Sequence, residues 1–188
     1  MLSSRSLKLA ILGCALLLAG CDRQSADKAQ PQTAASESTA VAVNGIDRSH
    51  KGSALPDFQL KDPAGKELNL TSLKGKPLLI NLWATWCAPC IAELPQLDAI
   101  AGRSTGLKVL TINQDTEKLD AVAKFLTERG VKNLEPWLNP DNSVMFQYDA
   151  PALPTTVLYG SDGREIWRTS GPRDWASAES AGLIAEAK

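Results

Sequence analysis

The stretch Pro77–Cys90, PLLINLWATWCAPC, decides the fold of this 188-residue chain. Residues 77–83 form a near-continuous apolar run, which is typical of a strand buried on both faces of a sheet. Residues 88–103 carry apolar side chains at helical spacing and therefore predict a helix. The pair Cys87 and Cys90 stands where the strand passes into the helix. A CxxC pair in this setting indicates redox chemistry.

The position of each cysteine predicts its role. Cys87 falls at the expected helix N-terminus, where unsatisfied N–H groups and the helix dipole favour a thiolate. A lowered pKa makes a thiol both a nucleophile near neutral pH and a better leaving group. Cys90 lies one turn further on, and we expect it to resolve a mixed disulfide by attacking Cys87. Pro89 suits the first helical turn, and Trp86 should shield the pair and contact substrate.

The flanking pattern predicts a mixed α/β fold. Short alternating strands are expected at 58–60 and 68–70, a buried strand at 107–113, a helix from Thr116 to about Arg129, a short helix at 142–148, a hairpin over 155–169 and a closing helix at 174–187. Strand–helix alternation followed by a hairpin and a helix implies a mixed sheet with helices on both faces. We place this domain at residues 54–188.

The N-terminus reads as a targeting segment. Arg5 and Lys8 precede an apolar run over residues 9–19, which has the length of a signal-peptide core. The run ends in Leu-Ala-Gly-Cys, which resembles the bacterial lipobox, and this resemblance implies a signal peptide at 1–20 and a lipid on Cys21. Asp22 resembles an inner-membrane retention signal. We therefore expect a lipid anchor on the periplasmic face of the inner membrane.

The number and positions of the cysteines then leave one pair for redox chemistry. Cys14 leaves with the signal peptide and Cys21 carries lipid, so Cys87 and Cys90 remain in an oxidising compartment. Residues 21–53 are rich in Ala, Ser, Thr and Gln and predict a flexible tether. The formal net charge is −1, which gives no basic excess of the kind nucleic-acid binding requires.

The stretch NLWATWCAPC, with Pro95 five residues after Cys90, resembles the active-site strand and kinked helix of the thioredoxin superfamily. Within it, the sequence resembles the TlpA-like branch of exported, membrane-tethered reductants, which includes ResA- and DsbE-like proteins. Leu153, Pro154 and Thr155 resemble the superfamily's cis-proline loop, which implies a substrate-binding role. The resemblance also implies a thioredoxin-like fold with an N-terminal short hairpin and a central strand–helix insertion within residues 113–148.

One departure from thioredoxin concerns the proton relay. Thioredoxin has a buried Asp six residues before the first cysteine, whereas this chain has Asn81, which cannot titrate. TlpA-like reductants often carry a Glu one turn past the second cysteine, where this chain has Glu93. A carboxylate whose pKa is raised by burial could take the proton from Cys90. We expect Glu93 to be catalytic.

The resemblance also implies the protein's partners. The expected clients are oxidised proteins, among them apocytochrome c or a copper-centre assembly protein, and the expected electron donor is a membrane protein of DsbD/CcdA type. We expect a monomer that needs no cofactor beyond the Cys87–Cys90 disulfide and binds neither metal nor nucleic acid. The apolar Ala88-Pro89 between the cysteines is typical of reducing members.

Three alternatives stay open. CxxC is half of many zinc or copper sites, but the mature chain adds only His50 to the two thiols, so metal handling is the main rival. Thiol peroxidases of related fold need a Thr three residues before the reactive cysteine, where this chain has Ala84 and places Thr85 one residue late. The pair could also form a purely structural disulfide.

Overall fold

The computed structural model describes residues 45–103 and 106–187. The predicted signal peptide, Cys21 and most of the predicted tether lie outside the described residues. No helix within the described residues combines the length and the apolar character needed to cross a bilayer.

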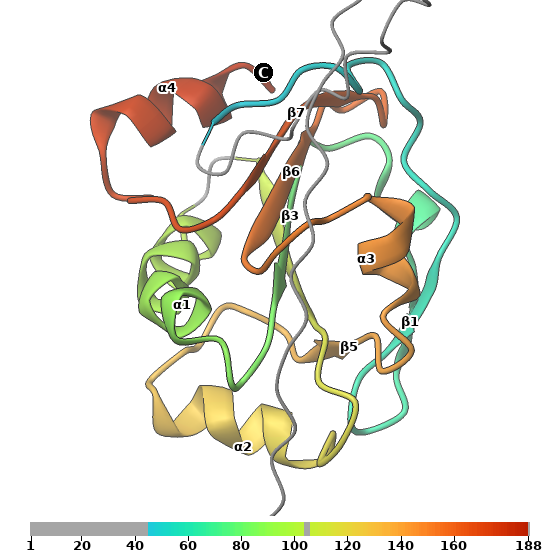
Figure 1. The fold of residues 1–188 in the computed structure, drawn as a ribbon, viewed down its shortest axis with the longest axis vertical. Coiled ribbons are helices and arrows are strands. Elements are labelled where there is room, and N and C mark those ends of the chain that lie inside the picture. Colours follow the sequence, from blue (N-terminus) through green and yellow to red (C-terminus); the bar gives the residue numbers. More distant parts are fainter. Residues whose placement is uncertain (1–44, 104–105, 188) are drawn as a thin grey trace, which may run out of the picture. The chain divides into compact units, whose positions relative to one another are not determined.

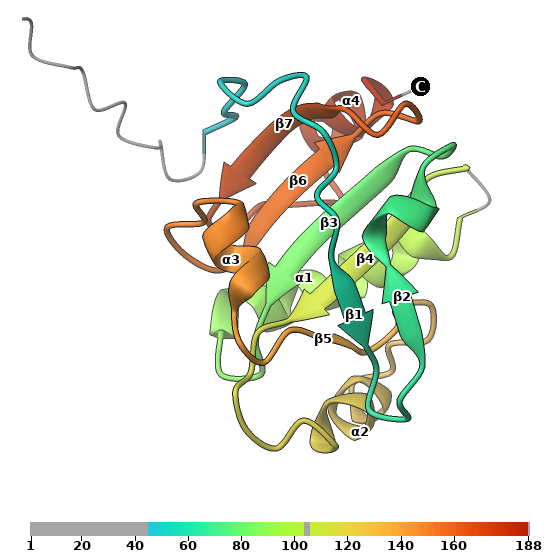
Figure 2. The same ribbon diagram turned by 90° about the vertical axis from the view of Figure 1, so that its right-hand side faces the viewer.

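Within the described residues, seven strands form one mixed sheet in the order β2-β1-β5-β4-β3-β6-β7. The strands are β1 (Gln59–Lys61), β2 (Glu67–Asn69), β3 (Leu78–Trp83), β4 (Lys108–Asn113), β5 (Trp137–Leu138), β6 (Thr155–Tyr159) and β7 (Glu165–Ser170). Strands β3, β4 and β5 run parallel, and the other neighbours pair antiparallel. Figure 2 looks onto this sheet, with β7 at one edge and β2 at the other.

Helices cover both faces of the sheet, as the sequence predicts. Figure 1 views the sheet nearly edge-on, with α1 (Ala88–Ala101), α2 (Ala121–Glu128) and α4 (Ala178–Ala185) on one side. The other side carries α3 (Ser143–Gln147) and the 3-10 helix η1 (Leu70–Leu73). The mixed sheet with helices on both faces is the arrangement expected from the sequence, and β1 and β2 form the predicted N-terminal hairpin.

The central strand β3 is buried along its whole length and divides the core in two. Leu79 and Trp83 face the layer of α1, α2 and α4, whereas Leu78, Ile80 and Leu82 face the layer of α3 and η1. This split follows the two-residue period of a strand and explains why the sequence shows an unbroken apolar run.

The folded domain begins earlier than the boundary predicted at residue 54. The Asp47 and Arg168 backbones exchange two hydrogen bonds, and Gly52 N–H donates to Glu165 O at 2.8 Å. Arg168 also forms a buried ion pair with Glu165, at 2.7 Å, and donates to the backbone carbonyl of Tyr148. The end of the predicted tether therefore pairs with the edge strand β7 through an isolated β-bridge.

Two predicted helices begin later than their patterns suggest. The second helix starts at Ala121 rather than Thr116, because the backbone of Lys118 has a positive φ of 54°, which is incompatible with a right-handed helix. The closing helix starts at Ala178, since residues 171–177 form a loop against α1. The short strand β5 belongs to the central insertion that the resemblance implies, although its two residues show no strand pattern of their own.

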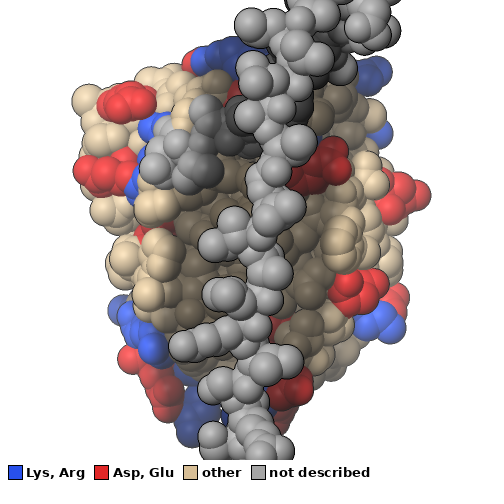
Figure 3. Space-filling model, viewed as in Figure 1, with Lys and Arg blue, Asp and Glu red and all other residues tan. Residues whose placement is uncertain are grey.

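Figure 3 shows the surface in the view of Figure 1. On the visible face, basic and acidic side chains occur in small separate groups, with no continuous field of one sign. This distribution matches the near-zero formal charge of the whole chain.

Candidate active site

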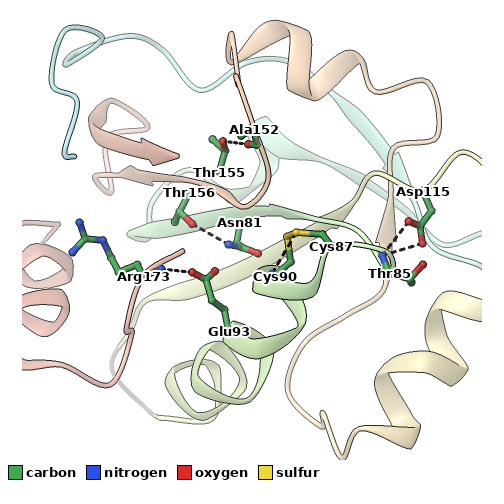
Figure 4. Close-up of a disulfide and its surroundings, with 10 residues drawn as sticks. All are labelled: Asn81, Thr85, Cys87, Cys90, Glu93, Asp115, Ala152, Thr155, Thr156 and Arg173. Carbon is green, nitrogen blue, oxygen red and sulfur yellow. Dashed lines mark hydrogen bonds between the residues drawn. A yellow bond between two sulfur atoms is a disulfide. The ribbon is translucent and has the colours of Figure 1, made fainter. Parts of the chain in front are cut away.

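Cys87 and Cys90 form a disulfide at the N-terminus of α1 (Figure 4). Cys87 is the N-cap residue, and its Sγ accepts a hydrogen bond from Cys90 N–H at 3.4 Å. Both cysteines are buried, at 5% and 1% exposure, and Cys87 is the more exposed of the two. The geometry therefore presents Cys87 as the sulfur that a substrate meets first. Pro89 occupies the first turn, and Pro95 lies inside the helix, where it removes one backbone hydrogen-bond donor.

The loop before Cys87 is held by a buried carboxylate. Thr85 N–H donates to Asp115 Oδ1 at 3.0 Å, and Asn113 Nδ2 donates to Asp115 Oδ2 at 3.2 Å. Asp115 N–H in turn donates to Asn113 Oδ1. These bonds tie the CxxC loop to the end of the neighbouring strand β4, as Figure 4 shows for Thr85. Asp115 fixes the backbone that leads into the nucleophile.

Glu93 lies on the Cys90 side of α1 and is buried at 4% exposure (Figure 4). Its Oε1 accepts a hydrogen bond from Arg173 N–H at 2.5 Å, whereas Oε2 has no hydrogen-bond partner within the described residues. Burial raises the pKa of Glu93, and the Arg173 amide lowers it only in part. The Trp175 indole and the Asn81 amide approach the carboxyl and also lower this pKa, although Trp175 Nε1 makes no full hydrogen bond there.

Asn81 is buried at the centre of β3 and belongs to the same group of polar side chains. Its Nδ2 donates to Thr156 Oγ1 at 2.9 Å, across the pairing of β3 with β6. The residue therefore links two strands by a hydrogen bond where thioredoxin has a titrating side chain. Glu93 is left as the buried carboxylate nearest this position, and its exposed fraction and pKa direction fit the predicted role in proton transfer.

The loop that ends in Pro154 lies level with the end of β3. The Leu153–Pro154 peptide is cis, and Thr155 pairs with Leu82 in the antiparallel register. Thr155 Oγ1 donates to Ala152 O at 2.7 Å, a bond within the loop that Figure 4 shows. Pro154 is buried and its carbonyl accepts a hydrogen bond from Gly171 N–H. The predicted substrate-binding loop thus sits at the sheet edge from which the CxxC loop departs.

The predicted residues Cys87, Cys90 and Glu93 lie together on α1 and its N-cap, and Leu153 packs against the same core cluster, whereas Cys21 lies outside the described residues. Sequence reasoning missed several residues that support this group. It did not single out Asp115, Gln96 or Arg173. Gln96 Oε1 accepts from Trp175 N–H at 2.7 Å and so helps dock the loop over Glu93. A signal for Asp115 existed, because polar residues directly after a buried parallel strand gather at the functional edge of a sheet. No feature of the sequence pattern predicts that the backbone N–H of Arg173 is a donor at this site.

Within the described residues, no group of three or more His, Cys, Asp or Glu side chains gathers as a metal site would require. His50 lies with its Nε2 4.0 Å from Asp47 Oδ2, on the segment that pairs with β7.

A cysteine pair at a strand-to-helix turn, a cis-proline loop at the same sheet edge and a buried carboxylate behind the second cysteine define a thiol–disulfide oxidoreductase of thioredoxin type. Comparison with known proteins places the chain more closely. Residues 50–183 match the family model described as Redoxin, and the chain belongs to this family.

Within the thioredoxin superfamily the protein is of ResA/DsbE type. It is 36% identical over 123 residues to the thiol–disulfide oxidoreductase ResA of Bacillus subtilis, covering 64% of this chain and 68% of the relative. It is 35% identical over 130 residues to ResA of Geobacillus thermodenitrificans, covering 68% and 69%. These matches confirm the family and the disulfide-exchange activity predicted from the CxxC setting.

Similar solved structures support the same fold. A thiol:disulfide interchange protein described as DsbE from Chlorobium tepidum superposes with a TM-score of 0.64 at 25% identity, covering 73% of this chain and 96% of that one. The exposed lipoprotein thioredoxin Etrx1 of Streptococcus pneumoniae gives a TM-score of 0.59 at 26% identity, covering 70% and 99%. The predicted thioredoxin-like fold is confirmed.

Proposed function

We propose that this oxidoreductase is a reductase of protein disulfides, anchored by a lipid on Cys21 at the periplasmic face of the inner membrane. One observation supports electron flow from this protein to its client. Within the described residues, Cys87 Sγ accepts a single hydrogen bond, from Cys90 N–H. In this disulfide form, the hydrogen bonds of the described residues therefore offer the Cys87 sulfur no stabilisation beyond the N-terminus of α1. Because stabilising the thiolate raises the potential of a couple, a sulfur with few donors supports a lower potential and a reducing role.

The proposed reaction has two steps. The Cys87 thiolate attacks a client disulfide, which breaks as a Cys87–client disulfide forms and one client thiolate leaves. Cys90 then loses its proton to the Glu93 carboxylate and attacks Cys87, releasing the second client thiolate. The client gains two electrons and the protein is left with the Cys87–Cys90 disulfide. No cofactor beyond this disulfide takes part, and a membrane donor of DsbD/CcdA type returns the electrons.

Trp86 and the Leu153–Thr155 loop are the proposed contacts for the client backbone. Trp86 is 71% exposed immediately before Cys87, and the cis-proline loop borders the same sheet edge. An extended client segment can pair with such a loop as an added strand. Apocytochrome c and copper-centre assembly proteins are the proposed clients.

The localisation rests on the lipobox-like sequence before Cys21 and on similarity to a relative described as an exposed lipoprotein. Metabolic labelling with a palmitate analogue tests it. We expect label on the wild-type chain and none on the Cys21→Ser variant. Label that persists in Cys21→Ser would contradict the anchor.

The direction of electron flow is tested in cells by alkylating free thiols before lysis. We expect most of the wild-type protein to carry reduced Cys87 and Cys90, and to become oxidised when the membrane electron donor is removed. A protein that is fully oxidised in the presence of its donor would act as an oxidant and would contradict the proposal.

A further inference from the structure

A hollow of about 420 Å³ lies beside the CxxC loop, between Trp86 and the outer side of α3. Its walls include Trp86 and Phe146, which are the large hydrophobic side chains exposed within the described residues, at 71% and 77%. Met145 and Ala150 add further apolar wall. Exposed aromatic side chains that gather around one hollow mark an interaction site more often than scattered ones do.

Asp149 is the charged side chain among the residues that line this pocket. Gln114 Nε2 donates to Ile112 O at 3.1 Å, which leaves Gln114 Oε1 buried and without a partner within the described residues. Asn142 Oδ1 is also buried without a partner there. The exposed Asp149 adds a carboxylate, and no Lys or Arg lines the pocket. Because both amide oxygens are buried, the Asp149 carboxylate is the group that distinguishes the opening, and the pocket combines apolar walls with this negative charge.

This combination selects one kind of occupant. A purely apolar side chain would fill the walls but desolvate the Asp149 carboxylate without a partner, and an acidic side chain would be repelled by it. Lys and Arg have an alkyl stem that packs on apolar surface and a cationic head that donates several hydrogen bonds. Their heads also interact favourably with the face of a Trp ring.

A second hollow, on the other side of Trp86, differs from this pocket in its charged lining residues. It is about 300 Å³, and Lys118 lines it together with Glu117 and Asp115. Asp115 in that hollow already accepts hydrogen bonds from Thr85 and Asn113, and Lys118 lines it together with Glu117, so opposite charges are present there. In the pocket beside α3, Asp149 is accompanied by no Lys or Arg, and we therefore place the preference for a basic side chain there.

We propose that the pocket formed by Trp86, Gln114, Asn142, Phe146 and Asp149 binds a lysine or arginine side chain of the client, near the cysteine that Cys87 attacks. The proposal rests on the disulfide exchange proposed above and adds a specificity subsite to it. The pocket shares Trp86 with the CxxC loop, so a client docked at Cys87 can reach it with a neighbouring side chain.

The part of the pocket wall formed by α3 is held in place by core residues beneath the helix. Val144 and Tyr148 are buried in the core beneath α3, so Phe146 is held on the outer side. The Tyr148 carbonyl also accepts a hydrogen bond from Arg168. The subsite therefore exists before a client arrives, and little ordering is required on binding.

The test compares synthetic disulfide peptides that differ by one charge. Arginine and its neutral isostere citrulline are placed in turn at each of the three positions on either side of the reactive cysteine. The second-order rate constant for reduction is measured in a single turnover with the reduced protein. We expect at least one position where arginine is favoured by about fivefold, the upper range for an ion pair near solvent, and where added salt reduces the preference.

Two variants test which residues cause the preference for arginine. Asp149→Asn keeps the side-chain shape and should abolish the preference for arginine, and Phe146→Ala should slow the arginine peptide by removing wall from the pocket. Glu128→Gln makes the same charge change on the exposed face of α2 and should leave the preference intact. Equal rates for arginine and citrulline at every position, or a preference that survives Asp149→Asn, would overturn the subsite.

Reduction of oxidised glutathione serves as the separate measure of exchange chemistry, because this small disulfide carries no basic side chain. Intact glutathione reduction with equal peptide rates would overturn the subsite alone. Absence of exchange with glutathione and with all peptides would overturn both the subsite and the proposed function.

Discussion

Two buried carboxylates flank the disulfide, and their surroundings differ (Figure 4). Asp115, beside the loop that leads to Cys87, accepts hydrogen bonds on both oxygens, from Thr85 N–H and Asn113 Nδ2. Glu93, on the Cys90 side, accepts one hydrogen bond on Oε1 and has a partnerless Oε2 within the described residues. Burial is similar, at 6% and 4% exposure, so the difference lies in the hydrogen bonds.

The same chemical group, a buried carboxylate, can therefore have two different roles at one site. A carboxylate with both oxygens bonded to donors works as an acceptor that fixes backbone. A buried carboxylate with an unsatisfied oxygen prefers the protonated form and is able to exchange a proton. We therefore assign Asp115 to positioning and Glu93 to proton transfer, and the predictions below test this division.

The largest expected effect is that of Glu93→Gln on the resolving step. Removing a general base typically costs about a hundredfold or more in rate, so we expect the second step to slow by ~100-fold and its pH dependence to flatten. Stopped-flow measurement of the decay of a Cys87 mixed disulfide gives this rate directly. Glu128→Gln on α2 serves as the control. A pH–rate profile identical to wild type would remove Glu93 from the mechanism.

A smaller effect is expected from Asp115. Asp115→Ala leaves the Thr85 amide without its acceptor, which costs about 1–3 kcal/mol and loosens the loop before Cys87, so kcat/KM should fall by about tenfold. Asp115→Asn retains an acceptor oxygen and should restore most of the activity. Neither variant should shift the pH–rate profile, in contrast to Glu93→Gln. Equal loss in Asp115→Ala and Asp115→Asn would show that charge, not hydrogen bonding, matters.

The raised pKa of Glu93 also predicts a pH-dependent stability. Its carboxyl holds a proton in the folded state at pH values where the unfolded group, with its ordinary pKa of 4.5, has lost it. Stability should therefore fall as pH rises from 4.5 through the folded pKa, by about 1.4 kcal/mol for each unit by which the fold raises that pKa.

Urea unfolding across this range measures the effect. Glu93→Gln has nothing to titrate at this position, so its free energy of unfolding should rise relative to wild type as the pH increases. A difference between the two proteins that does not change with pH would contradict the raised pKa and weaken the contrast with Asp115.

The smallest effect is expected away from the disulfide, at Glu135. Burial would raise the pKa of this carboxyl, but hydrogen bonds from Lys108 and Lys66 outweigh it and lower the pKa to about 2. The group stabilises the fold above pH 4.5, and this contribution is lost as the pH falls towards 2. Because the side chain is 37% exposed, Glu135→Gln should cost at most about 1 kcal/mol at pH 7.

Disulfide exchange should not respond to Glu135→Gln. The residue links β4 to the turn between β1 and β2 through Lys108 and Lys66, remote from the CxxC loop. Reduced kcat/KM in this variant would mean that the site is sensitive to any loss of stability, and the effects at Glu93 and Asp115 would need correction for it.

The sequence predicted the parts of this site that are local in the chain. The apolar run before Cys87 and the helical spacing after Cys90 are periodic signals, and they placed both cysteines correctly at the start of α1. The family resemblance located Glu93 and the loop containing Pro154, which no periodic pattern reveals.

What the sequence could not show depends on contacts between distant segments. The N–H of Arg173 reaches Glu93 across 80 residues, and Thr85 N–H reaches Asp115 across 30. Backbone donors of this kind carry no side-chain signature. The early start of the domain was missed for a related reason, because the pairing of Asp47 with Arg168 joins a polar segment to a sheet edge without any apolar pattern.

The two cysteines have different roles: Cys87 attacks the client disulfide and Cys90 resolves the mixed disulfide. Mass spectrometry of trapped complexes tests this assignment most directly, by mapping the disulfide formed with a client in Cys90→Ser and in Cys87→Ser. We predict that Cys90→Ser accumulates a mixed disulfide through Cys87, whereas Cys87→Ser accumulates none, because Cys90 is buried at 1% exposure. Equal trapping through Cys90 in the Cys87→Ser variant would contradict the division of roles between the two cysteines.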